Sequence, residues 1–378
     1  MDKKNKNPNV PNLRFKKYSN DWVKYKITDL GKMQRGKSKH RPRDDEKLYG
    51  GEYPFIQTGD IKKAHLYINE YEKTYSTYGL SQSKLWKKGT LCITIAANIA
   101  ETAILGMDAC FPDSIIGWCS NNQLTNNLFI KYYFDFYKEQ LKRLSVGGAQ
   151  ENLNLDKLEK IYFNIPSLQE QNKIADFFYK IDEKIVTQIK IISDYKTLKK
   201  GINYFLIGRY TPNTFISECL KCNTSSLKES EIIDENLGMF PVYGANGIIK
   251  NINTYMMDSS SISIVKDGAG AGRLNYLSGK YSFIGTLNCF TIKKGYNLKY
   301  IYYALENINF NRYIVGSGIP HVYYNDFKQE KIYIPADTKE IDKIEKCLSS
   351  IDSVIELETK KLSKLTLQKK YLINNMFI

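Results

Sequence analysis

Two stretches of the sequence, GGAQENLNLDKLEKIYFNIP at residues 147–166 and GSGIPHVYYNDFKQEKIYIP at residues 316–335, align without a gap at an offset of 169. Their apolar pattern matches more closely than their letters do, and both end in a proline. Upstream at the same offset, ITIAANIAETAIL from Ile93 lies over ISIVKDGAGAGRL from Ile262. Because such matches recur along the chain, the sequence predicts two copies of one structural unit.

A long amphipathic helix is expected after each copy. The residues before the proline alternate as in a strand, and after it apolar residues recur at intervals of three and four. The pattern continues for about five heptads in both segments, which is typical of a coiled coil. The alternative is two amphipathic helices that each pack on their own domain. The seam positions are Ile174, Phe178, Ile181, Ile185 and Ile192 in the first helix and, at an offset of 170, Ile344, Leu348, Ile351, Ile355 and Leu362 in the second.

The connectivity predicts that these helices run antiparallel. The first helix carries the chain roughly 55 to 60 Å from the first domain. The second domain begins after only the short segment GRYTPNT, residues 208–214, so the second helix must run back to pack on the first. Gln188 and Glu358, which are matched polar positions of the two seams, would then meet near the centre and fix the register.

The expected fold is therefore mixed α/β, with two similar globular domains separated by a long antiparallel two-helix coiled coil and related by a pseudo-two-fold internal repeat. The predicted parts are an N-terminal extension at 1–19, a first globular domain at 20–166, a first spacer helix at 167–208, a second globular domain at 209–335 and a second spacer helix at 336–378.

The composition favours a polyanionic partner. The chain has 378 residues, with 55 Lys and Arg against 40 Asp and Glu, which gives a formal charge of +15 and a pI near 9.2. Such a balance is typical of proteins that bind nucleic acid, although a basic protein without such a partner is the alternative. No apolar run reaches the length of about 18 residues that a membrane span needs. Seven scattered cysteines fit a reducing, cytoplasmic location.

A phosphate-binding motif is spelled by GKMQRGKS at residues 31–38, which fits the P-loop pattern letter by letter. A working P-loop follows a buried strand and opens a helix whose N-terminus holds the phosphate. The segment after Ser38, KHRPRDDEKLYGG, has a proline, alternating charges and no apolar helical face. The second copy has LKCNTSSL at this place, without a glycine. We therefore expect a basic loop, with a P-loop NTPase using Gly31–Ser38 as the alternative.

No catalytic, cofactor-binding or metal site stands out. The three histidines are far apart in the sequence, and the pair Cys219 and Cys222 has no second pair at zinc spacing. The glycine-rich loop DGAGAGR, residues 267–273, follows a predicted strand, and its backbone and Arg273 could contact a phosphate. It is a weak match to a dinucleotide-binding motif, because the segment after it is strand-like rather than helical. The sequence therefore predicts a binding protein. Two basic domains on a rigid spacer suit a bipartite target in duplex DNA. B-DNA repeats about every 34 Å, so each domain can read one major-groove segment while the bases between them stay unread.

Several motifs together resemble one known family. They are VPNLRF at 10–15, Trp22, LGKMQRGKS at 30–38, GGEYPFIQTGDI at 50–61, GGAQENLNLDKLEKIYFNIPSLQEQNKIADFFYKIDEKI at 147–185 and the echo of this last run at 316–355. Over nearly the whole chain they resemble the specificity subunit of type I restriction-modification systems. The family's Gly-Lys-Thr/Ser loop matches residues 36–38, but the second half lacks that loop and has Asn246 and Gly247 where Gly59 and Asp60 stand.

The resemblance implies two target-recognition domains, each followed by a spacer helix, that choose an asymmetric bipartite DNA sequence. It also implies that catalysis belongs to partners: two methyltransferase subunits that methylate adenine from S-adenosylmethionine, and ATP-dependent restriction and translocase subunits. This chain would hold no cofactor, and S-adenosylmethionine, ATP and Mg would be bound by the partners. A non-catalytic RNA-binding or structural adaptor is a further alternative. The DNA-binding candidates are Lys37, Ser38, Arg41, Arg43, Gln57, Thr58, Asn98, Asn246, Lys266 and Arg273.

Overall fold

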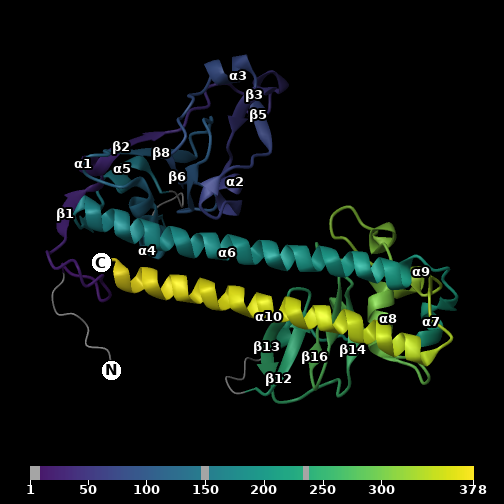
Figure 1. The fold of residues 1–378 in the computed structure, drawn as a ribbon. Coiled ribbons are helices and arrows are strands. Elements are labelled where there is room, and N and C mark those ends of the chain that lie inside the picture. The colour runs from purple at the N-terminus through teal and green to yellow at the C-terminus, as the bar shows by residue number, and fades with distance from the viewer. Residues whose placement is uncertain (1–8, 146–152, 233–237) are drawn as a thin grey trace. The chain divides into compact units, whose positions relative to one another are not determined.

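The computed structural model describes residues 9–145, 153–232 and 238–378 (Figure 1). Contacts within the chain divide it into two compact units: residues up to Lys190 together with Lys360–Ile378 form unit 1, and Ile191–Thr359 form unit 2. Two long helices, α6 (Leu168–Asn203) and α10 (Thr338–Met376), each contribute a segment to both units. A π-helical turn, Tyr204–Gly208, follows α6 directly.

Unit 1 is built around a five-stranded sheet in the order β2-β8-β6-β7-β4. Neighbouring strands are antiparallel, except that β4 joins β7 in parallel. All residues of β6 and β7 are buried, which explains their continuous apolar runs. The strands are β2 (Gly31–Arg35), β8 (Ile115–Ser120), β6 (Leu91–Thr94), β7 (Thr102–Leu105) and β4 (Tyr67–Ile68).

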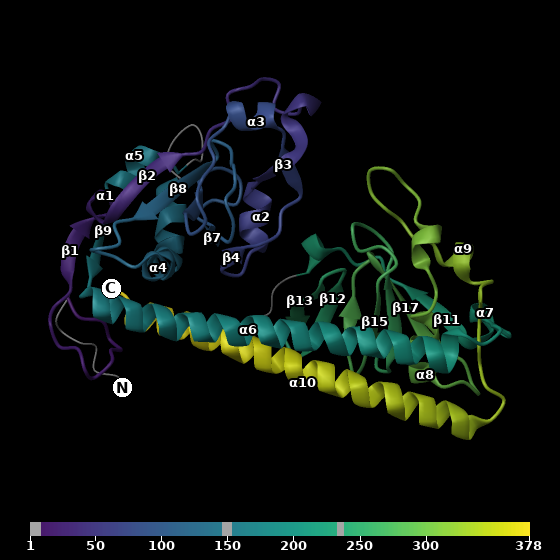
Figure 2. The ribbon, with the colours of Figure 1, turned by 45° about the horizontal axis from the view of Figure 1, so that its top comes forward.

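Two small antiparallel ribbons complete unit 1. One pairs β1 (Val23–Lys26) with β9 (Tyr162–Ile165), and the other pairs β3 (Tyr49–Phe55) with β5 (Lys73–Tyr75). In Figures 1 and 2 the helices α3 and α2 lie at opposite ends of β3. The helices of unit 1 outside the long pair are α1 (Ile27–Leu30), η1 (Glu46–Leu48), α2 (Thr58–Lys63), α3 (Thr77–Ser81), α4 (Asn127–Ser145) and α5 (Leu155–Glu159).

The main core of unit 1 lies between its sheet, α4 and the segments of both long helices that belong to the unit. Ile174 and Phe178 of α6 pack in the same buried cluster as Ile373 and Met376 of α10. The N-terminal segment joins this core as well, because Trp22 packs edge-on against Phe377. The seam residues at this end of the helices are therefore buried within one globular core, which takes in a segment of each long helix.

Unit 2 has a four-stranded antiparallel sheet in the order β11-β17-β14-β15, with the same strand directions as β2-β8-β6-β7 in unit 1. A second sheet has the order β13-β12-β16, and β10 pairs with β18. The strands are β10 (Thr214–Phe215), β11 (Leu220–Thr224), β12 (Phe240–Gly244), β13 (Gly247–Ile252), β14 (Ser261–Val265), β15 (Leu274–Leu277), β16 (Ser282–Phe283), β17 (Leu287–Ile292) and β18 (Lys331–Ile332).

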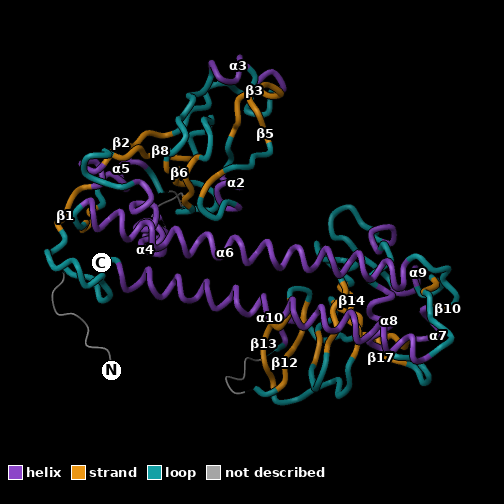
Figure 3. Tube along the Cα trace, viewed as in Figure 1, coloured by secondary structure: helices purple, strands orange, loops and turns teal. Residues whose placement is uncertain are grey.

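The core of unit 2 also takes in both long helices. Ile344 and Leu348 of α10 share a buried cluster with Tyr300 and Tyr303 of α8 (Leu298–Leu305), and Ile202 of α6 packs against this cluster. The side chain of Asn297 caps α8 by accepting a hydrogen bond from the Tyr300 amide at 3.0 Å. The helices of unit 2 outside the long pair are α7 (Ile216–Cys219), η3 (Glu229–Glu231), α8 (Leu298–Leu305), η4 (Phe310–Tyr313) and α9 (Tyr324–Phe327), and Figure 3 separates them from strands by colour.

The P-loop alternative is wrong in this structure. Gly31 lies inside β2, paired with Ser120, rather than in a turn after a strand. No helix follows Ser38, and the next helical residues are the single 3₁₀ turn that begins at Glu46. The N-terminus of a helix is what gives a P-loop its phosphate site, so GKMQRGKS cannot hold a nucleotide in that way.

None of the helices in the described part of the chain combines the length and apolar composition of a membrane span.

Candidate nucleic-acid interface

The loop between β2 and the 3₁₀ turn at Glu46, residues 36–45, is called the basic loop here, and backbone hydrogen bonds hold it to the rest of unit 1. The amide of Gly36 donates to the Ile115 carbonyl at 2.8 Å, and that of Lys37 donates to the Phe111 carbonyl at 3.0 Å. A Cβ at Gly36 would overlap the carbonyl oxygens of Phe111 and Pro112. Only glycine therefore fits this close approach, and the loop holds the exposed Lys37 side chain at a fixed place on the surface.

Arg41 and Arg43, two of the predicted DNA-binding residues, are engaged within the protein. Arg41 Nη1 donates to the carbonyls of Ser38 at 2.7 Å and His40 at 2.8 Å. Arg43 Nη2 donates to both carboxylate oxygens of Asp113, each at 2.9 Å. Both guanidinium groups thus shape the loop, and the sequence did not indicate this role.

A histidine and a carboxylate also shape this loop. His40 Nε2 lies 2.8 Å from Asp45 Oδ2, and the Tyr78 hydroxyl lies 3.1 Å from His40 Nδ1. The Lys47 amide and the His40 ring hold the pKa of Asp45 below its usual range. The loop is therefore built from a network of polar contacts, with Lys37 and Ser38 at its start.

The other predicted residues of unit 1 lie elsewhere. Gln57 and Thr58 follow the last residue of β3, whereas the basic loop precedes its first. Seven extended residues span roughly 20 Å at about 3.3 Å per residue. The structure therefore does not bring all of these residues into one cluster.

Asn98 lies in the turn between β6 and β7, which has unusual backbone geometry. Ala97, Asn98 and Ala100 have φ angles of 42°, 48° and 63°, in the left-handed region that residues other than glycine rarely adopt. The Thr94 hydroxyl donates to the Asn98 carbonyl at 2.5 Å and holds this turn. Backbone strain of this kind is common at binding sites, and the Asn98 side chain is exposed.

The three predicted residues of unit 2 come together. Arg273 Nη2 donates to the Ala245 carbonyl and lies 3.4 Å from Asn246 Oδ1. Lys266 begins the loop that Arg273 ends, since the Val265 amide donates to the Arg273 carbonyl at 2.9 Å. The turn after β12 and the loop after β14 therefore form one polar surface with two cations.

The sequence analysis missed two residues at this surface, His321 and Tyr323. His321 Nδ1 lies 2.8 Å from Asp267 Oδ1, and the Tyr323 ring is nearly parallel to the imidazole, 13° apart at 5.9 Å. No other histidine lies near His321 in the sequence, so the spacing of histidines gives no signal for this residue. The signal that could have identified it is its place in GSGIPH, one half of the repeated stretch. In the other half, residues 147–152 lie outside the described ranges.

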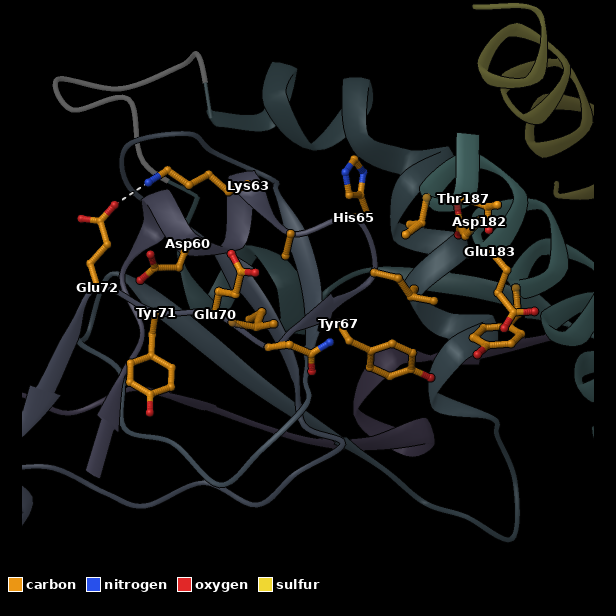
Figure 4. Close-up of a pocket in the computed structure, with 16 residues that line it drawn as sticks. Asp60, Lys63, His65, Tyr67, Glu70, Tyr71, Glu72, Asp182, Glu183 and Thr187 are labelled. Atoms are coloured by element: carbon orange, nitrogen blue, oxygen red, sulfur yellow. Dashed lines mark hydrogen bonds and ion pairs between the residues drawn. The ribbon is translucent and has the colours of Figure 1, made fainter. Parts of the chain in front are cut away.

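A cleft of about 720 Å³ in unit 1 has the opposite electrostatic character (Figure 4). Its walls come from the segment that begins at α2 and from α6, and one ion pair, between Lys63 and Glu72, lies at its edge. Burial raises the pKa of Tyr67, which also lines the cleft. Carboxylates repel a phosphate backbone, so this wall suits one less well than the basic loop does. They are Asp60, Glu70, Glu72, Asp182 and Glu183.

Metal chemistry gains no support from the geometry. In the ranges that the structure describes, no group of three or more His, Cys, Asp or Glu side chains is arranged to hold a metal ion. The two surfaces that gather predicted residues, the basic loop of unit 1 and the polar surface of unit 2, present cations and exposed loop backbone, together with carboxylates that pair with some of those cations. Groups of this kind contact phosphates and base edges.

Comparisons with known proteins agree with this picture. Residues 19–192 and 214–367 match the family described as "Type I restriction modification DNA specificity domain". The EcoprrI type I restriction enzyme specificity subunit of Escherichia coli is 18% identical over 369 residues, 90% of this chain and 92% of that protein. A putative type I restriction enzyme specificity subunit of Haemophilus influenzae is 29% identical over 164 residues, which are 42% of this chain and only 40% of that protein.

A solved structure has the same fold over almost its whole length. The S subunit of the type I restriction-modification system from M. genitalium superposes with a TM-score of 0.61 and 16% identity, covering 98% of this chain and 99% of that one. The family match covers both halves of the chain and most of its residues. The chain therefore belongs to the family of type I restriction-modification DNA specificity subunits.

Proposed function

We propose that this chain recognises an asymmetric bipartite sequence in double-stranded DNA, with each unit reading one half-site. The observation that carries the proposal is that both units have the same core sheet order, and each presents exposed basic and amide side chains on loops next to that sheet. The loops differ in sequence: Lys37 and Ser38 in unit 1 have no counterpart in the LKCNTSSL segment of unit 2. Unlike half-sites follow from unlike loops.

We propose further that the two globular parts are target-recognition domains, at residues 20–166 and 209–335, and that α6 and α10 form the antiparallel coiled coil that sets the distance between them. Two ion pairs support the internal repeat. In unit 1 Asp182 pairs with Lys369, and in unit 2 Lys199 pairs with Asp352. The two aspartates and the two lysines are each related by an offset of 170, the offset of the helix seams.

The register at the centre of the helices is a separate proposal. The seam pattern predicts that Gln188 meets Glu358. The two ion pairs share one antiparallel register. If this register continues along the helices without a break, residue 188 lies opposite residue 363 instead. Single cysteines at 188 and 358, compared with cysteines at 188 and 363, distinguish the two registers by the yield of disulfide in a folded variant.

In the proposed complex the chain supplies recognition and its partners supply catalysis. Two methyltransferase subunits would carry S-adenosylmethionine and methylate adenine, and restriction and translocase subunits would carry ATP and Mg. This assignment rests on membership of the specificity-subunit family and on the polar loop surfaces described above. The location that suits such a complex is the cytoplasm, where the genome lies.

The test is selection of binding sites from a randomised duplex library by the full-length chain together with its methyltransferase subunits. We expect enrichment of two short, unlike motifs at a fixed spacing. A matched RNA competitor should displace the selected duplex weakly. Equal competition by RNA would favour the adaptor alternative, and a selection that enriches no sequence would contradict the proposal.

A further inference from the structure

We propose that His321 is a specificity-determining residue of unit 2, which Asp267 orients so that its Nε2 contacts a base edge in the half-site of this unit. The inference rests on the proposed DNA recognition and names one residue that carries it. It starts from the loop of residues 316–320, which the backbone closes tightly. The amides and carbonyls of Val315 and His321 exchange two hydrogen bonds, of 2.9 and 2.8 Å.

The closed loop is narrow enough to approach a groove. Gly316 has a φ of 93°, and a Cβ there would lie 2.5 Å from the Ile319 carbonyl oxygen, so the turn needs glycine. The residues from Gly316 to Ile319 are exposed, and the Ile319 side chain is 62% exposed. The tip thus presents backbone, the Ser317 hydroxyl and the apolar side chain of Ile319, which suits close contact with base edges and thymine methyl groups.

The same loop is fixed to the cationic loop that follows β14. The Gly268 amide donates to the Pro320 carbonyl, and the Val322 amide donates to the Lys266 carbonyl, both at 2.9 Å. His321 therefore lies on the surface that Lys266, Asn246 and Arg273 also form. Of these, the cations Lys266 and Arg273 can hold phosphates and position the loop, as phosphate contacts do in DNA complexes.

The imidazole itself is held in one orientation. Its Nδ1 lies 2.8 Å from Asp267 Oδ1, and Lys266 Nζ lies 3.4 Å from the other oxygen of this carboxylate. A carboxylate in this place accepts a hydrogen bond from Nδ1–H and so leaves Nε2 as the ring nitrogen that can meet a ligand. With the side chain one-third exposed and the Tyr323 ring parallel to it, little freedom is lost on binding.

A base edge suits this nitrogen better than a phosphate does. The Asp267 carboxylate beside the ring opposes the approach of a phosphate, whereas a base edge presents neutral donors and acceptors. A purely structural histidine, which only joins two loops, would have the same contact with Asp267. A substitution that removes the ring nitrogens but keeps a similar side-chain volume distinguishes the two roles, because only a base-contacting histidine would then lose a sequence preference.

The experiment compares the full-length chain and its His321→Leu variant in selections from the randomised duplex library, with the methyltransferase subunits present. The matched control is His65→Leu, which changes an exposed histidine in the acidic cleft of unit 1. We expect His321→Leu to weaken the preference at one or two adjacent positions of one half-site by roughly tenfold, while the other half-site is unchanged. His65→Leu should select the parent sequence at every position.

A second variant, Asp267→Asn, tests the same contact independently in case His321→Leu does not fold. It keeps a hydrogen-bond acceptor for Nδ1 but removes the charge, so the preference should weaken at the same positions and by less. Unchanged preferences in a folded His321→Leu variant, or a uniform loss of affinity for all sequences, would overturn the inference. If the parent chain itself selected no sequence, the proposed function would fail first, and the two failures are therefore distinguishable.

Discussion

Lys369 Nζ on α10 lies 2.6 Å from Asp182 Oδ1 on α6, and the other oxygen of this carboxylate accepts a hydrogen bond of 2.7 Å from the Tyr132 hydroxyl. The Asp182 side chain is only 7% exposed. Unit 2 contains the same arrangement with the helices exchanged: Lys199 of α6 pairs with Asp352 of α10 at 2.8 Å, and the Tyr303 hydroxyl donates to that carboxylate at 2.8 Å. Each unit thus ties its two helix segments to its own globular core.

The first prediction concerns the cation of unit 1. Lys369→Met keeps the length of the side chain but leaves Asp182 buried without its partner. We expect a loss of about 2 to 4 kcal/mol in the free energy of unfolding, because an unpaired buried charge costs more than the pair contributes. Urea unfolding followed by circular dichroism measures it. Lys364→Met, an exposed lysine on the same helix, is the control. Equal stability of the two variants would contradict the assigned role.

The equivalent cation of unit 2 should matter at least as much. Lys199 contacts two carboxylates, Glu306 at 3.0 Å and Asp352 at 2.8 Å. Lys199→Met should therefore destabilise the chain by a similar or larger amount, and Asp352→Asn in the same chain should restore part of the loss. Lys200→Met, at the exposed neighbouring position, serves as the control. A double variant that is less stable than Lys199→Met would argue against the pairing.

The parts of the fold that follow from local periodicity could be predicted from the sequence. The seam residues Ile174, Phe178, Ile344 and Leu348 are all buried, because apolar spacing along a helix encodes the face that packs. The contacts that form the binding surfaces could not be predicted in this way. Asp267 and His321 are 54 residues apart, and no local pattern indicates that folding joins them.

The glycine motif at residues 31–38 indicated where a glycine is needed but not what the glycine is needed for. Gly36 is the second glycine of the P-loop pattern, and the structure shows that the groups close to it are the carbonyls of Phe111 and Pro112. Arg43 remains a predicted contact to DNA, and its guanidinium also pairs with Asp113, 70 residues along the chain. Charge alone does not tell a free cation from one that the fold uses.

Stability should fall in alkaline solution. Burial, with the adjacent Asp182 carboxylate, raises the pKa of Tyr132, and burial also raises the pKa of Tyr303. Burial raises the pKa of both Cys219 and Cys222 to about 11. The folded state keeps these protons to a higher pH than the unfolded chain does, so the stabilisation is complete below about pH 9 and is lost as pH rises from there through the raised pKa values of the folded state.

The measurement is the urea midpoint between pH 8 and 10.5. Tyr303→Phe should show a shallower decline above pH 10, because one buried hydroxyl no longer contributes. Tyr371→Phe, at a position 54% exposed, should decline as the parent does. A midpoint that is constant or rises over this range would show that these groups do not titrate as the structure implies.

Contacts to phosphate should appear in the salt dependence of binding. Lys37→Gln removes an exposed cation of the basic loop and should lower the affinity for all duplexes, with the slope of log K against log salt reduced in magnitude by about one. Lys63→Gln removes another exposed cation, one that pairs with Glu72 at the edge of the acidic cleft, and its slope should equal that of the parent. A parental slope for Lys37→Gln would remove this loop from the interface.

The central claim is that one chain directs adenine methylation to two unlike half-sites at a fixed spacing. The most direct measurement is a map of methylated adenine in a genome that encodes this chain, compared with the same strain lacking it. The account predicts methylated sites with two different short motifs separated by a constant number of unread base pairs, all lost when the chain is absent. A single contiguous motif, or methylation that persists without the chain, would contradict it.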